Sequence, residues 1–165
     1  RRTPSPFLLE RRYWQARLAR IDTVHRGLLI LPRQDLTTPF ADVVEWRMRG
    51  HDGVTLWGLR AVSPFHPDPR GVCVREVSAT ELPEVRLEAV MEGWAEFVLQ
   101  IPAGRRLEDR VLDLLRVVQV GLSTFGLGLD AVRMEASVPA GEGRRPADEL
   151  VIAERLVREG LCSPA

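Results

Sequence analysis

The sequence lacks lysine and asparagine entirely, so all 23 of its basic residues are arginine. Its 23 Asp and Glu residues balance these arginines to a formal net charge of zero. A nucleic-acid-binding protein usually carries a basic excess, and this chain has none. An arginine-only set of cations is typical of a GC-rich genome, which is a simpler explanation than Arg-specific recognition of phosphate or carboxylate. We therefore expect no nucleic-acid partner.

Cysteine, histidine and long apolar runs are also scarce. The two cysteines, Cys73 and Cys162, lie far apart and form no Cys-x-x-Cys pair, which excludes a redox or zinc motif of that kind. His25, His51 and His66 show no metal-ligand spacing, so we expect neither a metal nor another cofactor. No stretch approaches the roughly 18 consecutive apolar residues of a membrane span, so we expect no membrane partner. Unpaired cysteines suit a reducing compartment, and we expect a cytoplasmic protein.

The remaining composition is that of an ordinary folded domain. With 165 residues, 45% of them hydrophobic, the chain can bury a core without disulfide or metal staples. We therefore expect a single domain over residues 1–165. Residues 7–21 predict an N-terminal helix, because Trp14, Leu18 and Ile21 recur at helical spacing.

A β-hairpin is predicted over residues 43–62, where residues 43–49 alternate apolar and polar side chains and Asp52-Gly53 supplies the turn. Before it, residues 28–31 form a short apolar run, to which the pattern assigns no element. After it, residues 71–160 alternate between strands and helices. The expected strands cover residues 71–77, 96–101 and 131–136, and the expected helices begin at Pro83, Leu107 and Pro146. This order predicts an α/β three-layer sandwich, with a mostly parallel sheet, an antiparallel hairpin at one edge and helices on both faces.

Few side chains offer catalytic chemistry. Ser123 lies in a Gly-x-Ser-x-x-Gly segment at the end of the long predicted helix, where the partial negative charge of a helix C-terminus disfavours an alkoxide. Ser137 follows the last predicted strand without a Gly-x-Ser-x-Gly pattern around it, so both serines are weak candidates. Glu84, Glu88 and Glu92 step along one predicted helix face, which is most simply a solvated face.

The facing strands of the predicted hairpin each carry a tryptophan, Trp46 and Trp57. If the two rings pair across the strands and face outward, they form an interface for another protein, because aromatic residues are enriched at interfaces. If they face inward, they belong to the core. The sequence leaves both interpretations open.

Three short motifs follow one another along the chain: Tyr13-Trp14 in the first helix, His51-Asp52-Gly53 in the hairpin, and Leu129-Asp130-Ala131-Val132-Arg133-Met134 before the last strand. This order resembles the first half of an α/β-hydrolase, especially of the acetyl-xylan esterase and cephalosporin-C deacetylase group. The resemblance covers residues 7–136. It implies an oxyanion loop after the strand at 71–77 and a nucleophile after the strand at 131–136.

The catalytic parts that this resemblance implies are missing. Ser78-Ala79 stands where the family has His-Gly, and Ser137 is followed by Pro139, which has no N–H to donate to an oxyanion. We therefore expect a non-catalytic α/β-hydrolase-like domain that acts by protein–protein contact, as a homo-oligomer or an accessory subunit. Two alternatives stay open: a small-ester hydrolase with a rearranged or partner-completed site, and a small-ligand-binding module.

Overall fold

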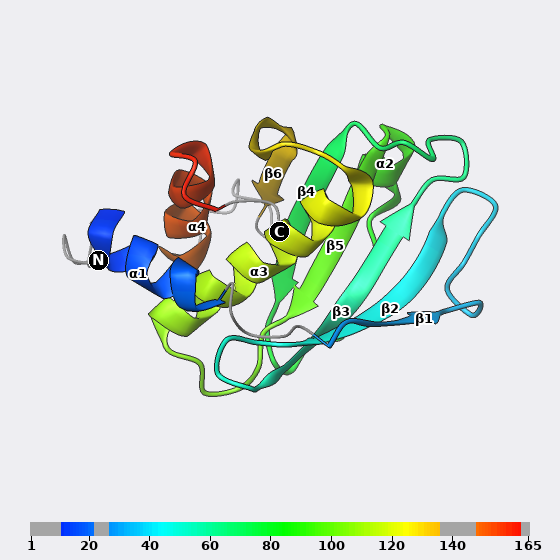
Figure 1. The fold of residues 1–165 in the computed structure, drawn as a ribbon. Helices are drawn as coiled ribbons and strands as arrows, with labels where there is room; N and C mark the ends of the chain where they lie inside the picture. Colours follow the sequence, from blue (N-terminus) through cyan, green and yellow to red (C-terminus); the bar gives the residue numbers. More distant parts are fainter. Residues whose placement is uncertain (1–10, 22–26, 136–147, 163–165) are drawn as a thin grey trace, which may run out of the picture.

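The computed structural model describes residues 11–21, 27–135 and 148–162, which form one mixed sheet with helices packed against it (Figure 1). Its elements, in chain order, are α1 (Arg11–Ile21), β1 (Leu29–Pro32), β2 (Asp42–Arg49), β3 (Thr55–Val62), β4 (Gly71–Val77), α2 (Leu87–Met91), β5 (Trp94–Gln100), α3 (Leu107–Phe125), a 3-10 turn (Leu129–Ala131), β6 (Val132–Glu135) and α4 (Asp148–Arg158). The hairpin predicted over residues 43–62 is confirmed as β2 and β3.

The predicted helices are present with different bounds. Residues 7–10 of the first helix lie outside the described residues, and α1 covers the rest. α2 begins only at Leu87, because Arg86 is extended (φ −99°, ψ 118°) and donates its backbone N–H to Glu96 at 2.6 Å. Glu84 therefore precedes α2 and Glu92 caps its C-terminus, so the predicted acidic helix face does not form.

The sheet is mostly antiparallel, so the prediction of a mostly parallel sheet is wrong. Its strand order is β1-β2-β3-β5-β4-β6, and only the pairs β4–β5 and β4–β6 are parallel. Connections without a helix join β1 to β2 and β2 to β3, and these permit antiparallel pairing, whereas parallel neighbours need a crossover such as one containing α2 or α3. The apolar run at residues 28–31 supplies the additional strand. The hairpin is therefore not the edge of the sheet, because β1 lies outside it along β2.

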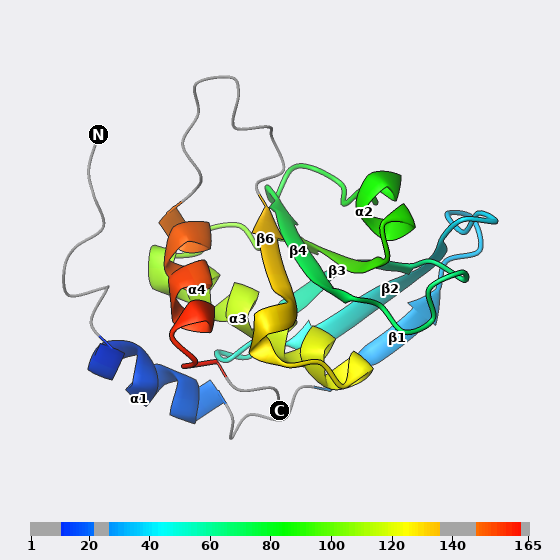
Figure 2. The same ribbon diagram turned by 90° about the horizontal axis from the view of Figure 1, so that it is seen from above.

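Helices cover both faces of the sheet unequally (Figure 1, Figure 2). On one face, the larger core cluster joins Trp14 of α1, Val118 of α3 and Leu156 of α4 to the sheet. On the other face, a smaller cluster packs Val90 of α2 against Leu59 of β3. Among the described helices, α2 alone covers this second face, which we call the α2 face.

Arg116 anchors α3 from within the core. Arg116 is only 1% exposed. Its guanidinium group donates hydrogen bonds to the carbonyl oxygens of Arg49 at 2.8 Å and Ile21 at 3.1 Å. One guanidinium therefore holds the end of β2 and the end of α1. Gly121 lets the same helix approach the sheet closely, because a Cβ there would lie 3.0 Å from a methyl carbon of Val72.

None of the described helices combines the length and the apolar character that crossing a membrane would require. The expected cytoplasmic location stays a prediction.

Candidate functional site

The parallel strands β4, β5 and β6 have their carboxyl ends on the same side of the sheet. In α/β folds, ligands bind beyond these strand ends. β5 ends there at Gln100, which accepts a hydrogen bond from the indole N–H of Trp57 at 2.5 Å and donates to the carbonyl oxygen of Glu81 at 2.8 Å. Ser78 and Thr80 follow β4, with their hydroxyl oxygens 3.1 Å apart. The Gln100 contacts tie β3 and the loop after β4 to the end of β5.

A chain of ion pairs, centred on a buried carboxylate, lies near these strand ends on the α2 face. Glu96 is fully buried and accepts from Arg75 at 3.1 Å and from Arg86 at 3.4 Å. Arg86 also binds Glu135 at 2.7 Å. Burial raises the pKa of Glu135, but the guanidiniums of Arg86 and Arg133 outweigh it and hold that pKa below its ordinary value. Glu135 is therefore ionised at neutral pH and already compensated, which suits it poorly to general acid catalysis.

Cys73 is the nearest thiol to this network, with Sγ 3.9 Å from a guanidinium nitrogen of Arg86. Burial, together with the carboxylates of Glu135 and Glu96, raises the pKa of the Cys73 thiol to about 12. Such a thiol carries almost no thiolate at neutral pH, so Cys73 is not an activated nucleophile.

A second pair of carboxyl groups is buried on the opposite face, between β4 and α4. Glu76 is 7% exposed and Glu149 is 4% exposed. Burial first, then a hydrogen bond to Glu149 and repulsion by it, raises the pKa of Glu76 to about 9. Glu76 is therefore protonated at neutral pH. Arg110 lies 3.4 Å from Glu149 and balances the charge of the pair.

The serine candidates are not placed as a catalytic pair with a base. Ser123 lies in the last turn of α3, while His51 contacts Asp109 at the start of the same helix. Ser123 comes fourteen positions after Asp109 in α3, which is about 21 Å along the helix axis. Ser137 lies outside the described residues, so both serines remain weak candidates.

Trp46 and Trp57 do not form a cross-strand pair, and that expectation is corrected. The register sets Trp46 opposite Gly58 and Trp57 opposite Arg47, so the two rings lie on opposite faces of the sheet. Trp46 is a core residue that is 2% exposed. Its ring occupies the space above Gly58, because a Cβ atom on Gly58 would lie only 2.8 Å from a ring carbon of Trp46. Trp57 is half-buried on the α2 face, and its role at an interface stays a prediction.

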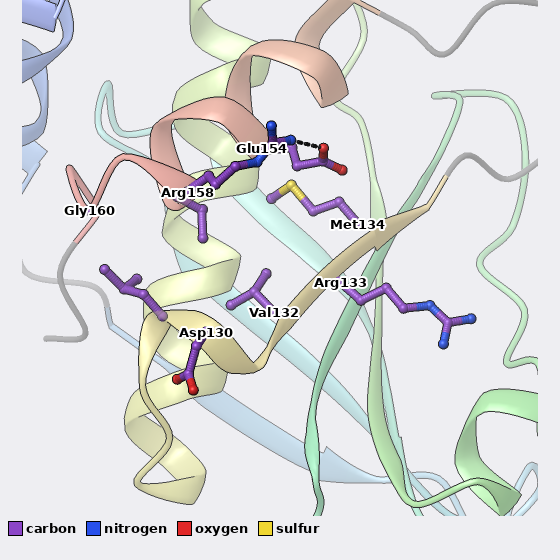
Figure 3. Close-up of a pocket in the computed structure, with 9 residues that line it drawn as sticks. Asp130, Val132, Arg133, Met134, Glu154, Arg158 and Gly160 are labelled. Atoms are coloured by element: carbon purple, nitrogen blue, oxygen red, sulfur yellow. Dashed lines mark hydrogen bonds and ion pairs between the residues drawn. The ribbon is translucent and has the colours of Figure 1, made fainter.

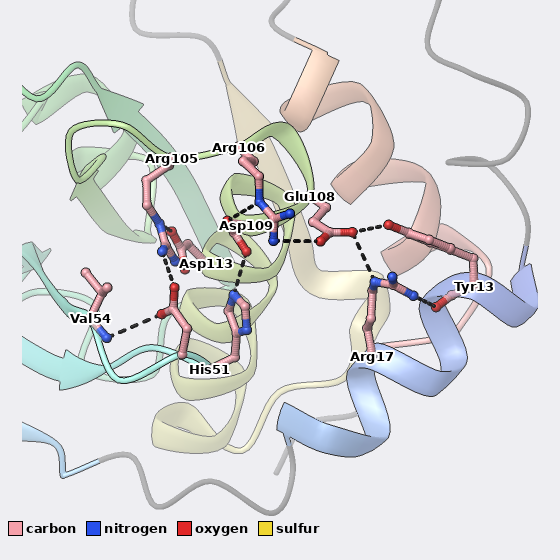
Figure 4. Close-up of polar contacts among 10 residues, drawn as sticks. Tyr13, Arg17, His51, Val54, Arg105, Arg106, Glu108, Asp109 and Asp113 are labelled. Carbon is pink, nitrogen blue, oxygen red and sulfur yellow. Dashed lines mark hydrogen bonds and ion pairs between the residues drawn. The ribbon is translucent and has the colours of Figure 1, made fainter.

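A polar network joins the hairpin turn to the start of α3 (Figure 4). The Nε2 atom of His51 lies 3.1 Å from Asp109, and Arg105 binds both Asp52 and Asp113. Ligand atoms of His51, Asp52 and Asp109 all lie within 4.8 Å of one another, a spacing that a metal ion could bridge. The sequence shows no sign of this cluster, because Asp109 reaches His51 only through the fold.

Arginines already compensate the carboxylates of this network. Arg105 binds Asp113 at 2.7 Å, and Arg106 binds Asp109 at 3.2 Å. Glu108, next along α3, accepts from Tyr13 and, at 3.1 Å, from Arg17 of α1. Each carboxylate of the network therefore has an arginine partner, and these contacts tie α1, the hairpin and α3 together.

A groove of about 500 Å³ runs between β6 and α4 (Figure 3). Val132 and Met134 of β6 and Val157 of α4 give it apolar walls, and the ion pair between Glu154 and Arg158 lies along α4. Its described lining residues include no hydroxyl, thiol or imidazole group. The groove is therefore a candidate for binding rather than for catalysis.

The outermost strand β1, at the opposite side of the sheet from β6, carries the most concentrated exposed apolar surface. Every residue of β1 is exposed, and the connection to β2 adds two more large apolar side chains. We call this surface the β1 patch; its members are Leu28 (41% exposed), Leu29 (51%), Ile30 (41%), Leu31 (40%), Leu36 (40%) and Phe40 (50%). Apolar surface gathered in this way marks contact sites for other molecules.

Neither a protein-family model nor a curated protein sequence matches this chain. The fold does match solved structures. An acetyl xylan esterase from a Paenibacillus species aligns with a TM-score of 0.65 and 13% sequence identity, over 81% of this chain and 52% of that chain. Acetyl xylan esterase 1 from a Thermoanaerobacterium species aligns with a TM-score of 0.61 and 12% identity, over 94% of this chain and 56% of that one. The chain thus spans about half the length of these esterases, and it has the fold of part of an α/β-hydrolase, as the order of its motifs predicted.

Proposed function

We propose that this chain is a non-catalytic α/β-hydrolase-like domain that works by protein–protein contact. The observation that carries the proposal is the β1 patch, in which an apolar strand forms the edge of the sheet, unpaired on its outer side within the described part of the chain. A free edge presents unpaired backbone N–H and C=O groups to a second chain, and natural proteins usually protect such an edge with charges. Here the edge strand is Leu-Ile-Leu-Pro, which suits docking of a partner.

The chemistry of the described polar clusters supports this proposal. Glu96 and Glu135 are held by arginines, and Cys73 is a neutral thiol. Ser123 lies far along α3 from the His51–Asp109 contact. Each cluster thus stabilises the fold and leaves its groups compensated or neutral, whereas covalent catalysis needs an activated nucleophile beside a base.

Ester hydrolysis tests the proposal directly. We expect the purified chain to hydrolyse p-nitrophenyl acetate no faster than its Ser123→Ala/Ser137→Ala double variant, and to remain unlabelled by a fluorophosphonate probe. Light scattering, alone and with the products of neighbouring genes, should reveal an assembly. A strict monomer that turns over esters, with activity lost in the double variant, would overturn the proposal.

A second candidate function, small-ligand binding, is favoured by the groove between β6 and α4. A thermal-shift screen of small amphipathic compounds tests it. A ligand present at 100 times its dissociation constant adds about 2.7 kcal/mol of stability. A Met134→Trp variant, which fills the groove, should abolish any such shift, and a shift that survives this change would place the ligand elsewhere.

A further inference from the structure

We propose that the partner seated on the β1 patch is a second copy of this chain, with β1 paired antiparallel to β1 of the other copy about a two-fold axis. This inference rests on the proposed function, because it names the partner of that contact surface.

Among the residues that the structure describes, none pairs with the outer side of the β1 backbone. The backbone N–H of Arg33 donates to the carbonyl oxygen of Val43 at 3.0 Å, which fixes the phase of the strand relative to β2. Because hydrogen bonds of an antiparallel strand alternate between its two sides, every second residue back from Arg33 bonds to β2. Leu28 and Ile30 therefore direct both of their backbone groups away from the sheet. Pro32, the next residue on that side, has no N–H and ends the free ladder.

One register uses all of these groups. A two-fold axis at Leu29 places Leu28 of each copy opposite Ile30 of the other, and each such pair exchanges two hydrogen bonds. Leu29 then lies opposite Leu29 of the second copy, in the closely spaced pair that forms no hydrogen bonds. A register shifted by one pair would set Leu28 opposite Pro32, where one bond forms instead of two because Pro32 has no N–H. We place the axis at Leu29 because each bonded pair then exchanges two hydrogen bonds.

The charges beside β1 fit a second copy. Arg33 binds Asp35 at 2.7 Å and Glu45 at 3.0 Å, and Arg47 binds Glu45 at 2.8 Å. These described side chains compensate one another within the chain, so they neither select an oppositely charged partner nor repel an identical one. The formal net charge of zero removes long-range repulsion between copies as well. An uncharged apolar strand pairs best with another such strand, and β1 itself meets that description.

The area of the patch suits a modest dimer. Its members are 40–51% exposed, and a patch of that make-up covers several hundred Å². Pairing of two four-residue strands covers only the part of this surface that lies along β1, so the contact belongs to the small end of specific interfaces. We therefore expect a dimer whose population depends on protein concentration.

The alternative pairing of β1 with β6 of another copy would grow into an open fibre. The charges of β6 disfavour this pairing. Arg133 and Glu135 occupy alternate positions of that four-residue strand, Arg133 binds Glu135, and Glu135 also binds Arg86. Docking the apolar β1 there would desolvate these charges without replacing their partners. Pairing of β1 with itself closes after two copies.

A charge-exchange experiment at Leu29 tests the inference. Wild-type chain should form a dimer in light scattering as concentration rises. Leu29→Asp and Leu29→Arg should each be monomeric at the same concentrations, because the axis brings two like charges together. An equimolar mixture of the two variants should recover the dimer, now with one copy of each. Leu82→Asp is the matched control, since Leu82 is 75% exposed and lies away from β1, so this variant should dimerise as wild type does.

Folding is checked by far-UV circular dichroism on every variant, and recovery in the mixture shows independently that both variants are folded. A wild-type chain that stays monomeric at all concentrations, a dimer that survives Leu29→Asp, unlimited growth, or a mixture that does not re-associate would each overturn self-pairing. In those cases the proposed function still holds under two conditions. The chain must lack esterase activity, and a different protein must bind the wild-type chain but not the Leu29→Asp variant. Esterase turnover that depends on Ser123 or Ser137 would instead defeat the proposed function.

Discussion

Single buried polar residues do much to define this fold. Glu96 and Arg116 are each at most 1% exposed, and each has close partners of suitable polarity. Glu76 differs, because its Oε2 atom has no hydrogen-bond partner among the described residues. A buried polar group without a partner costs free energy. Burial of Glu76 therefore works against stability when its carboxyl group is charged.

Replacing Glu76 by glutamine should change how stability depends on pH. The pKa of Glu76 is about 9 in the folded chain and near its ordinary value of 4.5 when unfolded, so the folded state binds the proton more tightly. Its stabilising contribution is complete below pH 4.5 and is lost as pH rises through 9. Between these limits the free energy of unfolding should fall by up to about 1.4 kcal/mol per pH unit from this group. Glu76→Gln should flatten that slope in urea titrations from pH 5 to 9.

The matched control for this prediction is Glu84→Gln, which changes an exposed carboxylate. It should leave the pH slope at its wild-type value. Equal slopes for wild type and Glu76→Gln would show that Glu76 is not the group that titrates with folding.

At the scale of elements, Arg116 joins α1, β2 and α3 through two backbone carbonyl groups. Arg116→Met keeps most of the side-chain volume but leaves both carbonyl oxygens without this donor. We expect a loss of about 3 kcal/mol in the free energy of unfolding, measured with urea. Arg155→Met, at an exposed arginine that pairs with Glu159, should cost about 0.5 kcal/mol or less. Equal costs for the two variants would contradict the anchoring role of Arg116.

The edge strand β1 offers a second test, because proline distinguishes its two sides. Ile30→Pro removes an N–H that faces away from the sheet, so it should cost less than about 1 kcal/mol and still abolish dimerisation. Leu31→Pro removes an N–H that bonds to β2 and should cost about 3 kcal/mol. Urea unfolding and light scattering measure the two effects separately. If Ile30→Pro unfolded the chain as readily as Leu31→Pro, the phase assigned to β1 would be wrong.

At the scale of the whole molecule, one core cluster connects helices from both ends of the chain. Trp14 of α1 and Leu156 of α4 pack in the same cluster as Trp46 of β2. We therefore expect a single cooperative unfolding transition, with an urea m value of about 2 kcal/mol per molar. Tryptophan fluorescence and far-UV circular dichroism should give the same midpoint. A separate early transition in the dichroism signal alone would show that a helix unfolds independently of the sheet.

The sequence predicted those parts of the fold that depend on local pattern. The hairpin followed from alternation and turn residues, the strand at residues 71–77 from its apolar run, and α3 from its apolar stripe. The strand at residues 29–32 was missed, because four apolar residues have no periodicity by themselves and become a strand only by pairing with β2. This strand adds a third antiparallel pair, so antiparallel pairs outnumber the two parallel ones, and it replaces the hairpin as the outermost strand of the sheet.

The polar clusters could not be predicted for a similar reason. His51 meets Asp109, and Glu76 meets Glu149, only because distant segments pack together, and neither pair has a signature in spacing. The two tryptophans were placed on facing strands correctly, but one residue of register decides which face each ring occupies.

By itself, the sequence determined the α/β class of the domain and its resemblance to part of an α/β-hydrolase, because these depend on residue types in order along the chain. The tertiary structure alone decided which strand forms the free edge and which charges are already paired. Those properties depend on register and packing between segments far apart in sequence, and they are what turns the apolar run at residues 28–31 into an exposed edge strand.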